Sequence, residues 1–243
     1  MNQQNRRHFI KKMGGSAFAF SVFTQFSACD FDKKRPNILI IQPDQHRGSV
    51  MGCAGDINVN TPHLDQFAEE GIRFTKCFSA SPVCSPFRGT MQTGLYCYQH
   101  GVVRNNIQMD TDLKTIAEYY VDSGYATGYI GKWHLDGGWP DPWPHGRKKG
   151  MPLNLGYVPP QNRQGWQDWL GYEKSHQYFN VAKINEQGKA VKIPGYDWEP
   201  EWMTDEALRF IRQKERENKP WMYYLAYGPP HLPNECPDRK SVV

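Results

Sequence analysis

The stretch at 37–41 reads Asn-Ile-Leu-Ile-Ile and lies between Pro36 and Pro43. A short run of branched apolar residues bounded by prolines is typical of a buried strand. Similar runs return at 125–130 and at 221–226. Segments with helical periodicity separate these runs, and strands that alternate with helices indicate an α/β fold with a mainly parallel sheet flanked by helices.

Helical patterns occupy four segments. In the first, Thr61-Pro62 supplies an N-cap with proline at the first helical position, and Gly71 ends the helix. The remaining helices are expected at 86–94, at 112–124 with Asp112 as N-cap, and from 204 onward, and a further short strand is expected at 72–78. Between 137 and 200, Trp, Pro, Gly, Tyr and basic residues replace any periodic pattern, which predicts a loop-rich insertion.

Length and composition fit a folded globular protein, because the chain has 243 residues, of which 39% are apolar and 14% aromatic. The net charge is only +4. We therefore expect no nucleic-acid partner, whereas a small anionic substrate suits the few basic clusters.

The first residues have the features of an export signal. Arg6 and Arg7 precede a moderately apolar stretch at 13–28, which is shorter than the roughly 20 residues that a membrane span needs. The stretch ends in Phe-Ser-Ala-Cys at 26–29, which resembles the cleavage box of a bacterial lipoprotein. We expect an export signal at 1–29 with a lipid anchor at Cys29.

An ordinary signal peptide cleaved near Ala28 is the alternative to lipidation. Either signal predicts an exported protein, in the periplasm or at the cell surface of a bacterium. The remainder, 30–243, is expected to form part of one catalytic domain.

Four cysteines besides Cys29 and Cys84 could form disulfides in an exported protein. Their spacings resemble no disulfide framework, so we expect buried free thiols; they are Cys53, Cys77, Cys97 and Cys236.

Polar residues follow the predicted strands at their carboxyl ends. Asp44 and Gln45 follow the first strand, Lys132 and His134 follow the second, and His231 follows the third. Ligands of α/β sheets bind in the crevice beyond the carboxyl ends of the strands. The sequence therefore predicts a site at this edge of the sheet.

Cys84 contributes a nucleophile candidate to the same site. Pro86 and the helical segment after it place position 84 at a helix N-terminus, where backbone N–H groups and the helix dipole favour an anion.

Four motifs resemble those of one enzyme family. Arg35 to Ile41 leading into Asp44 resembles the opening strand of the sulfatase family. The other three matches are the C-x-P-x-R signature in Cys84-Ser85-Pro86-Phe87-Arg88 followed by Gly94, the G-K-W-H-L segment at 131–135, and the P-H-x-P segment at 230–233. In this order they resemble the N-terminal portion of a formylglycine-dependent, cysteine-type sulfatase.

The resemblance implies an alkaline-phosphatase-like α/β fold, truncated at its C-terminal side, and hydrolysis of sulfate esters with Ca²⁺. A formylglycine-generating maturation enzyme would oxidise Cys84. One hydroxyl of the hydrated aldehyde would attack sulfur, and loss of the second hydroxyl's proton would then expel sulfate.

The resemblance also implies a role for each site residue. Asp44, Gln45 and modified Cys84 would bind the metal, Arg88 would hold the formylglycine, Lys132 would contact sulfate, His134 would accept a proton, and His231 would contact sulfate or protonate the leaving oxygen. Two departures from the family pattern are Gln45, where many members carry an aspartate, and Phe87, where Ser is usual.

The resemblance favours a sulfated carbohydrate as substrate. A phosphate or phosphonate ester hydrolase of the same superfamily is one alternative. The other is a non-catalytic glycan-binding surface lipoprotein, which would use an aromatic and basic stretch: Trp139, Trp143, His145, Arg147, Lys148 and Lys149.

Overall fold

The computed structural model describes residues 35–137, 156–179, 181–185, 187 and 189–237. Contacts divide the chain into residues 1–35 and 36–243, and the helices and strands that the structure describes lie in the second unit. The predicted export signal, Cys29 and the aromatic and basic stretch at 139–149 lie outside the described residues.

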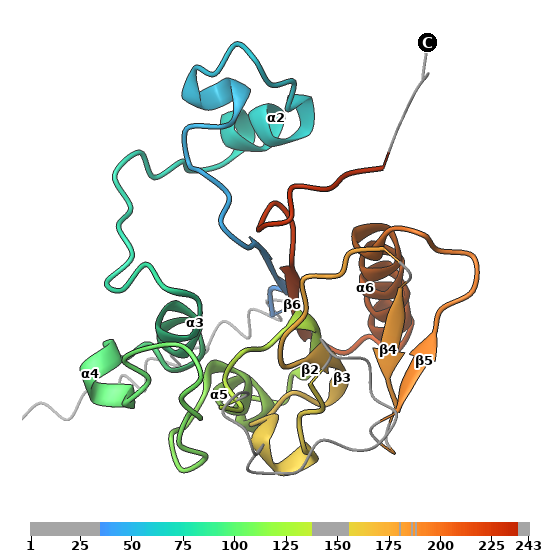
Figure 1. Cartoon of the computed structure of the whole chain (residues 1–243). Coiled ribbons are helices and arrows are strands. Elements are labelled where there is room, and N and C mark those ends of the chain that lie inside the picture. Colours follow the sequence, from blue (N-terminus) through green and yellow to red (C-terminus); the bar gives the residue numbers. More distant parts are fainter. Residues whose placement is uncertain (1–34, 138–155, 180, 186, 188, 238–243) are drawn as a thin grey trace, which may run out of the picture. The chain divides into compact units, whose positions relative to one another are not determined.

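A four-stranded parallel sheet is the centre of the fold (Figure 1). Its order is β1-β6-β2-β3, and all three pairings are parallel. The bounds are Ile38–Pro43 for β1, Trp221–Tyr227 for β6, Ala126–Lys132 for β2 and Asp168–Tyr172 for β3. The predicted α/β class with a mainly parallel sheet is confirmed.

Helices cover both faces of this sheet (Figure 1). Helix α6, Glu199–Arg216, packs Met203 and Phe210 against one face. Helix α5, Ile116–Asp122, packs Ala117 against the other face in a cluster that includes Tyr129. The alternation of side chains along β2 and β6 supplies apolar residues to both clusters, as a parallel sheet covered on both sides requires.

Shorter elements complete the structure. The remaining helices are η1 Gly52–Ala54, α2 Pro62–Glu70, α3 Cys84–Thr93, α4 Cys97–His100 and η2 Pro160–Asn162, and β4 Ala182–Ile184 pairs antiparallel with β5 Ala190–Lys192. Within the part of the chain that the structure describes, the helices are too short or too polar to cross a bilayer.

The strand predicted at 72–78 is wrong. The segment forms no strand, and Ile72, Phe74 and Phe78 are 85%, 78% and 86% exposed. A strand needs a neighbouring strand for its backbone hydrogen bonds, and apolar side chains alone do not supply one.

Two helix starts also differ from the prediction. Asp112 does not cap α5; Thr115 does, because its hydroxyl accepts from the Glu118 N–H while the Glu118 carboxylate accepts from the Thr115 N–H. Helix α6 begins at Glu199, before the start predicted at 204.

The segment at 137–200 contains more regular structure than the predicted loops. Its described part supplies β3, which pairs with β2 from Gly128 to Lys132. The four cysteines predicted to be buried free thiols are free but not buried: Cys77 and Cys236 are exposed, and Cys53 and Cys97 are half-buried.

Candidate active site

The carboxyl edge of the sheet brings Asp44 and Lys132 together. Asp44 follows β1, and its N–H donates to the Tyr227 carbonyl at the end of β6. Lys132 ends β2 directly after Gly131, whose φ is +103°. A Cβ at position 131 would lie 2.1 Å from the Ala226 carbonyl oxygen, so only glycine allows β2 to approach β6 this closely before Lys132.

Two buried cations pair with the carboxylate of Asp44. Lys132 Nζ donates to Asp44 Oδ2 at 2.6 Å, and Arg88 Nη2 lies 3.4 Å from the same oxygen. Burial acts to raise the pKa of Asp44, but Arg88 and Lys132 outweigh it and hold that pKa below its ordinary value. Asp44 is therefore ionised, and the three charges sum to one positive charge, which favours an anionic ligand.

Backbone contacts hold these cations in place. The carbonyl of Lys132 accepts hydrogen bonds from Arg88 Nη1 at 2.5 Å and from the Tyr129 hydroxyl at 2.6 Å. The guanidinium of Arg88 thus connects α3 to the ends of β1 and β2.

The thiol of Cys84 lies beside this charge cluster. Its Sγ is 3.8 Å from Lys132 Nζ and 3.9 Å from Asp44 Oδ1. Cys84 is the first residue of α3, as the sequence predicts, and the N–H of Ser85 donates to Asn105 Oδ1 at 2.9 Å. The side chain is half-buried, so a ligand can reach it.

His231 joins the same cluster. One ligand atom each of Asp44, Cys84 and His231 lie within 4.8 Å of one another. The Tyr178 hydroxyl donates to the His231 carbonyl at 3.1 Å, which ties the loop after β6 to the segment after β3.

His134 is buried beside the cluster in a left-handed backbone conformation with φ +59°. Its N–H donates to the Glu173 carbonyl at 2.8 Å, but among the described residues neither ring nitrogen has a hydrogen-bond partner. Burial, reinforced by Lys132 and Arg88, lowers the pKa of His134 to about 2, so its imidazole is neutral.

Gln45 also has a left-handed backbone, with φ +61°, and its side chain is exposed. Its predicted role as a metal ligand stays a prediction.

Three further residues support the site and were missed from the sequence. Asn105 caps the start of α3, and Glu173 Oε2 accepts the N–H groups of Leu135 and Asp136 at 3.1 and 2.9 Å. His176 contacts His231, with ring centroids 4.1 Å apart. Glu173 and His176 follow β3, so recognising that strand would have pointed to both.

A metal ion fits the donor set only in part. The buried carboxylate of Asp44 suits a hard cation, whereas the thiol of Cys84 and the imidazole of His231 suit a softer one. Replacement of the thiol at position 84 by an oxygen ligand would complete a pair of oxygen donors for Ca²⁺.

The motifs and the geometry agree with a comparison against known families, in which the Sulfatase family matches residues 36–242. The chain belongs to the sulfatase family. It is 34% identical over 206 residues to an ulvan-active sulfatase from Formosa agariphila, a match that covers 85% of this chain and 37% of the relative.

Solved sulfatase structures share the fold. A Bacteroides fragilis protein described as a sulfatase superposes with a TM-score of 0.76 at 30% identity, over 85% of this chain and 46% of that one. Another structure, a complex with its substrate D-glucosamine-2-N,6-O-disulfate, superposes with a TM-score of 0.61 at 25% identity, over 82% of this chain and 35% of that one. This chain therefore spans less than half of the length of each of these sulfatases. Over the aligned region it has the same alkaline-phosphatase-like fold as the solved structures.

Proposed function

We propose that the full-length protein hydrolyses sulfate esters of glycans, with formylglycine made from Cys84 and with Ca²⁺. The observation that carries the proposal is the position of the Cys84 Sγ at a helix N-terminus, 3.8 Å from Lys132 Nζ and 3.9 Å from Asp44 Oδ1. A nucleophile at this position would meet an anionic ester within reach of a buried cation.

The residues around Cys84 have complementary tasks in this proposal. Lys132 and Arg88 would offset the charge of the sulfate and of Asp44. His134 would accept the proton that is released when sulfate leaves, which requires the bound sulfate to raise the pKa of His134 by offsetting these two cations. His231 in its doubly protonated form would contact a sulfate oxygen, or give a proton to the departing alcohol oxygen, through Nε2. Formylglycine would supply a nucleophile that is regenerated at the end of each cycle.

Asp44, modified Cys84 and Gln45 would hold Ca²⁺, which would supply positive charge beside the sulfate. Maturation would need a formylglycine-generating enzyme that recognises the motif formed by Cys84, Pro86 and Arg88. Sulfated glycans are the proposed substrates because related sulfatases are named for ulvan and solved with a disulfated glucosamine.

We further propose that this chain is the N-terminal part of a catalytic domain. β1 lies at an edge of the sheet, where Leu39 and Ile41 are 43% and 57% exposed, and α2 contains no buried residue. Exposed apolar side chains beside an open strand edge are typical of a surface that another part of the protein covers. Export through the signal at 1–29 and a lipid anchor at Cys29 complete the proposal.

The test compares the full-length protein with its Cys84→Ala variant after co-expression with a formylglycine-generating enzyme. Peptide mass spectrometry should find an aldehyde at position 84 of the wild-type protein. The wild type should release sulfate from ulvan, heparin and 4-nitrophenyl sulfate, and the Cys84→Ala variant should release none. Cys97→Ala, which changes a half-buried cysteine in α4, is the matched control.

Three outcomes contradict the proposal. An unmodified Cys84 in a protein that still binds sulfated glycans would support the binding lipoprotein instead. Faster turnover of 4-nitrophenyl phosphate than of the sulfate would support a phosphoesterase. Full activity after chelation by EGTA would show that hydrolysis does not require Ca²⁺.

A further inference from the structure

One backbone carbonyl holds two imidazole rings. The oxygen of Leu232 lies 2.9 Å from Nδ1 of His176 and 2.8 Å from Nδ1 of His231. The two rings meet edge to face, with centroids 4.1 Å apart and an interplanar angle of 76°. His176 is therefore held against a residue of the active site.

The shared carbonyl fixes the proton of each ring. A carbonyl oxygen has two lone pairs and only accepts hydrogen bonds, so Nδ1 must carry the hydrogen in both imidazoles. In a neutral His176 ring this leaves a lone pair at Nε2. Nε2 of His176 is thus an acceptor for a ligand that carries a donor.

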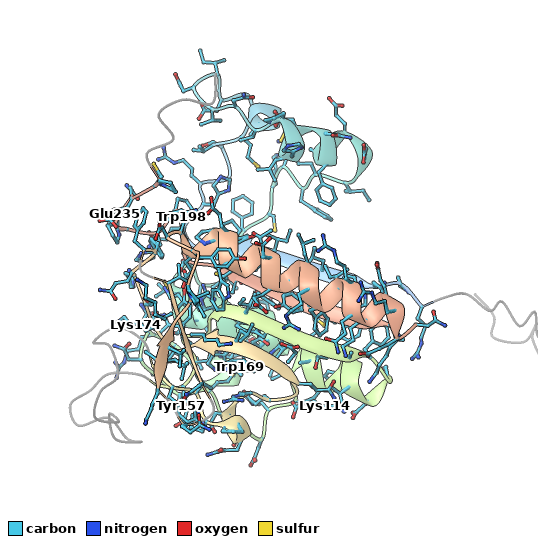
Figure 2. The ribbon with its side chains drawn as sticks, turned by 90° about the vertical axis from the view of Figure 1, so that its right-hand side faces the viewer. Lys114, Tyr157, Trp169, Lys174, Trp198 and Glu235 are labelled. Carbon is cyan, nitrogen blue, oxygen red and sulfur yellow. The ribbon has the colours of Figure 1, made fainter. Side chains whose placement is uncertain are left out.

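The order of the sheet places His176 at the edge where the site lies. Asp44 follows β1, His231 follows β6, and Lys132 ends β2; the fourth strand, β3, is followed by the segment that contains His176. In Figure 2, Lys174 from this segment lies at the left of the view with Trp198, whereas Lys114 lies toward the right. Burial is the main cause that lowers the pKa of both His134 and His176, and the charges of Lys132 and Lys174 lower both pKa values further.

We propose that His176 binds the carbohydrate part of the substrate, through a hydrogen bond from a sugar hydroxyl to its Nε2. This inference rests on the proposed function. A sulfate oxygen carries no hydrogen and cannot donate to a neutral Nε2, whereas a hydroxyl next to the ester can. His176 then distinguishes a sulfated sugar from an aryl sulfate that lacks such a hydroxyl.

The alternative role for His176 is to support the Leu232 carbonyl and, through it, His231. The variant His176→Asn separates the two roles, because an asparagine amide can replace Nδ1 as the donor to Leu232 but has no counterpart of Nε2. Gln177→Asn, at the exposed neighbouring position, is the matched control.

The experiment measures kcat/KM of the full-length, matured protein on ulvan oligosaccharides and on 4-nitrophenyl sulfate. For His176→Asn, we expect the ratio of the glycan value to the aryl value to fall about tenfold, mainly through KM, because one substrate hydrogen bond is lost. An equal fall on both substrates, or no fall on the glycan, would overturn the proposal.

A separate measurement keeps this inference distinct from the proposed function. In the Cys84→Ala protein, calorimetry should show about tenfold weaker binding of ulvan oligosaccharides when His176→Asn is added. Equal affinities would contradict the role of His176 even if wild-type turnover is robust. If the wild type releases no sulfate while this difference in affinity persists, the proposed chemistry fails and the binding role of His176 stands.

Discussion

Lys132 donates from Nζ to Oδ2 of Asp44 at 2.6 Å, and both side chains are buried. A buried carboxylate that accepts from an ammonium group is stabilised by a charge-assisted hydrogen bond. Removal of either group leaves the charge of the other buried without this partner, which is costly. The pair also joins the ends of β1 and β2, which are not neighbours in the sheet because β6 lies between them.

Replacing Lys132 by Met should destabilise the protein by about 3 kcal/mol, because it leaves Asp44 buried with only the longer contact to Arg88. Urea unfolding followed by circular dichroism measures the change. Asp44→Asn in the same background should recover part of the loss, with a coupling energy of about 1 to 3 kcal/mol in a double-mutant cycle.

Lys114→Met is the control for this cycle, because Lys114 pairs with Asp122 at the surface. It should leave the unfolding midpoint unchanged, since exposed ion pairs contribute little. Additive effects of the Lys132 and Asp44 substitutions would contradict a direct interaction between the two.

The position of Asp44, Lys132 and His231 at one edge was predictable because a single rule suffices: the carboxyl ends of parallel strands meet. Cys84 at the start of α3 was predictable from Pro86 and the helical pattern after it. These predictions depend on local sequence and on one property of the sheet.

The contribution of β3 was not predictable in the same way. Its sequence, Asp-Trp-Leu-Gly-Tyr at 168–172, lacks a run of branched apolar residues because the strand lies at the edge and is half-exposed over its first three positions. Missing β3 meant missing His176. The shared carbonyl of Leu232 depends on two segments 56 residues apart, and no local pattern reports such a contact.

His134 should contribute a loss of stability as the pH is lowered below about 6.5. Its pKa in the folded protein is lowered to about 2, mainly by burial, whereas the unfolded chain takes up a proton near 6.5. The unfolded state therefore binds more protons between these values, and up to about 1.4 kcal/mol of stability is lost per pH unit.

His134→Gln should remove this part of the loss. Between pH 6.5 and pH 5, its unfolding free energy should decline by about 2 kcal/mol less than that of the wild type. His63→Gln, an exposed histidine of α2, should keep the wild-type slope. If the unfolding free energies of His134→Gln and wild type decline equally with pH, His134 has the same protonation in the folded and the unfolded state, which would contradict the prediction.

Glu199 should act in the opposite direction at higher pH. Burial raises its pKa from 4.5 to about 8, although a hydrogen bond from the Tyr172 hydroxyl at 3.2 Å opposes the rise. The folded protein then keeps a proton that the unfolded chain releases above about 4.5. The contribution of Glu199 to stability therefore falls as the pH rises from 4.5 to 8, by up to about 4 kcal/mol.

Glu199→Gln removes the ionisation but keeps an oxygen for Tyr172, so the variant should be more stable than the wild type at pH 8 and similar at pH 5. Thermal unfolding at the two pH values measures this difference. Glu215→Gln, at an exposed position of α6, should behave as the wild type at both. A Glu199→Gln variant that gains nothing at pH 8 would mean that the carboxylate is ionised in the folded protein.

Gly131→Ala should destabilise the protein by at least about 3 kcal/mol, because it combines two penalties. The backbone has φ +103°, and the new Cβ would lie 2.1 Å from the Ala226 carbonyl oxygen, inside the sheet.

Gly94→Ala provides the comparison. Gly94 has φ +71° at the end of α3, but nothing lies within 4 Å of the position that an alanine methyl would take. Only the left-handed backbone is therefore penalised, by about 1 kcal/mol. Chemical unfolding of both variants separates the steric effect from the backbone effect. Equal losses would mean that β2 can move away from β6 at Gly131, and Lys132 would then not be held against Asp44 by the sheet.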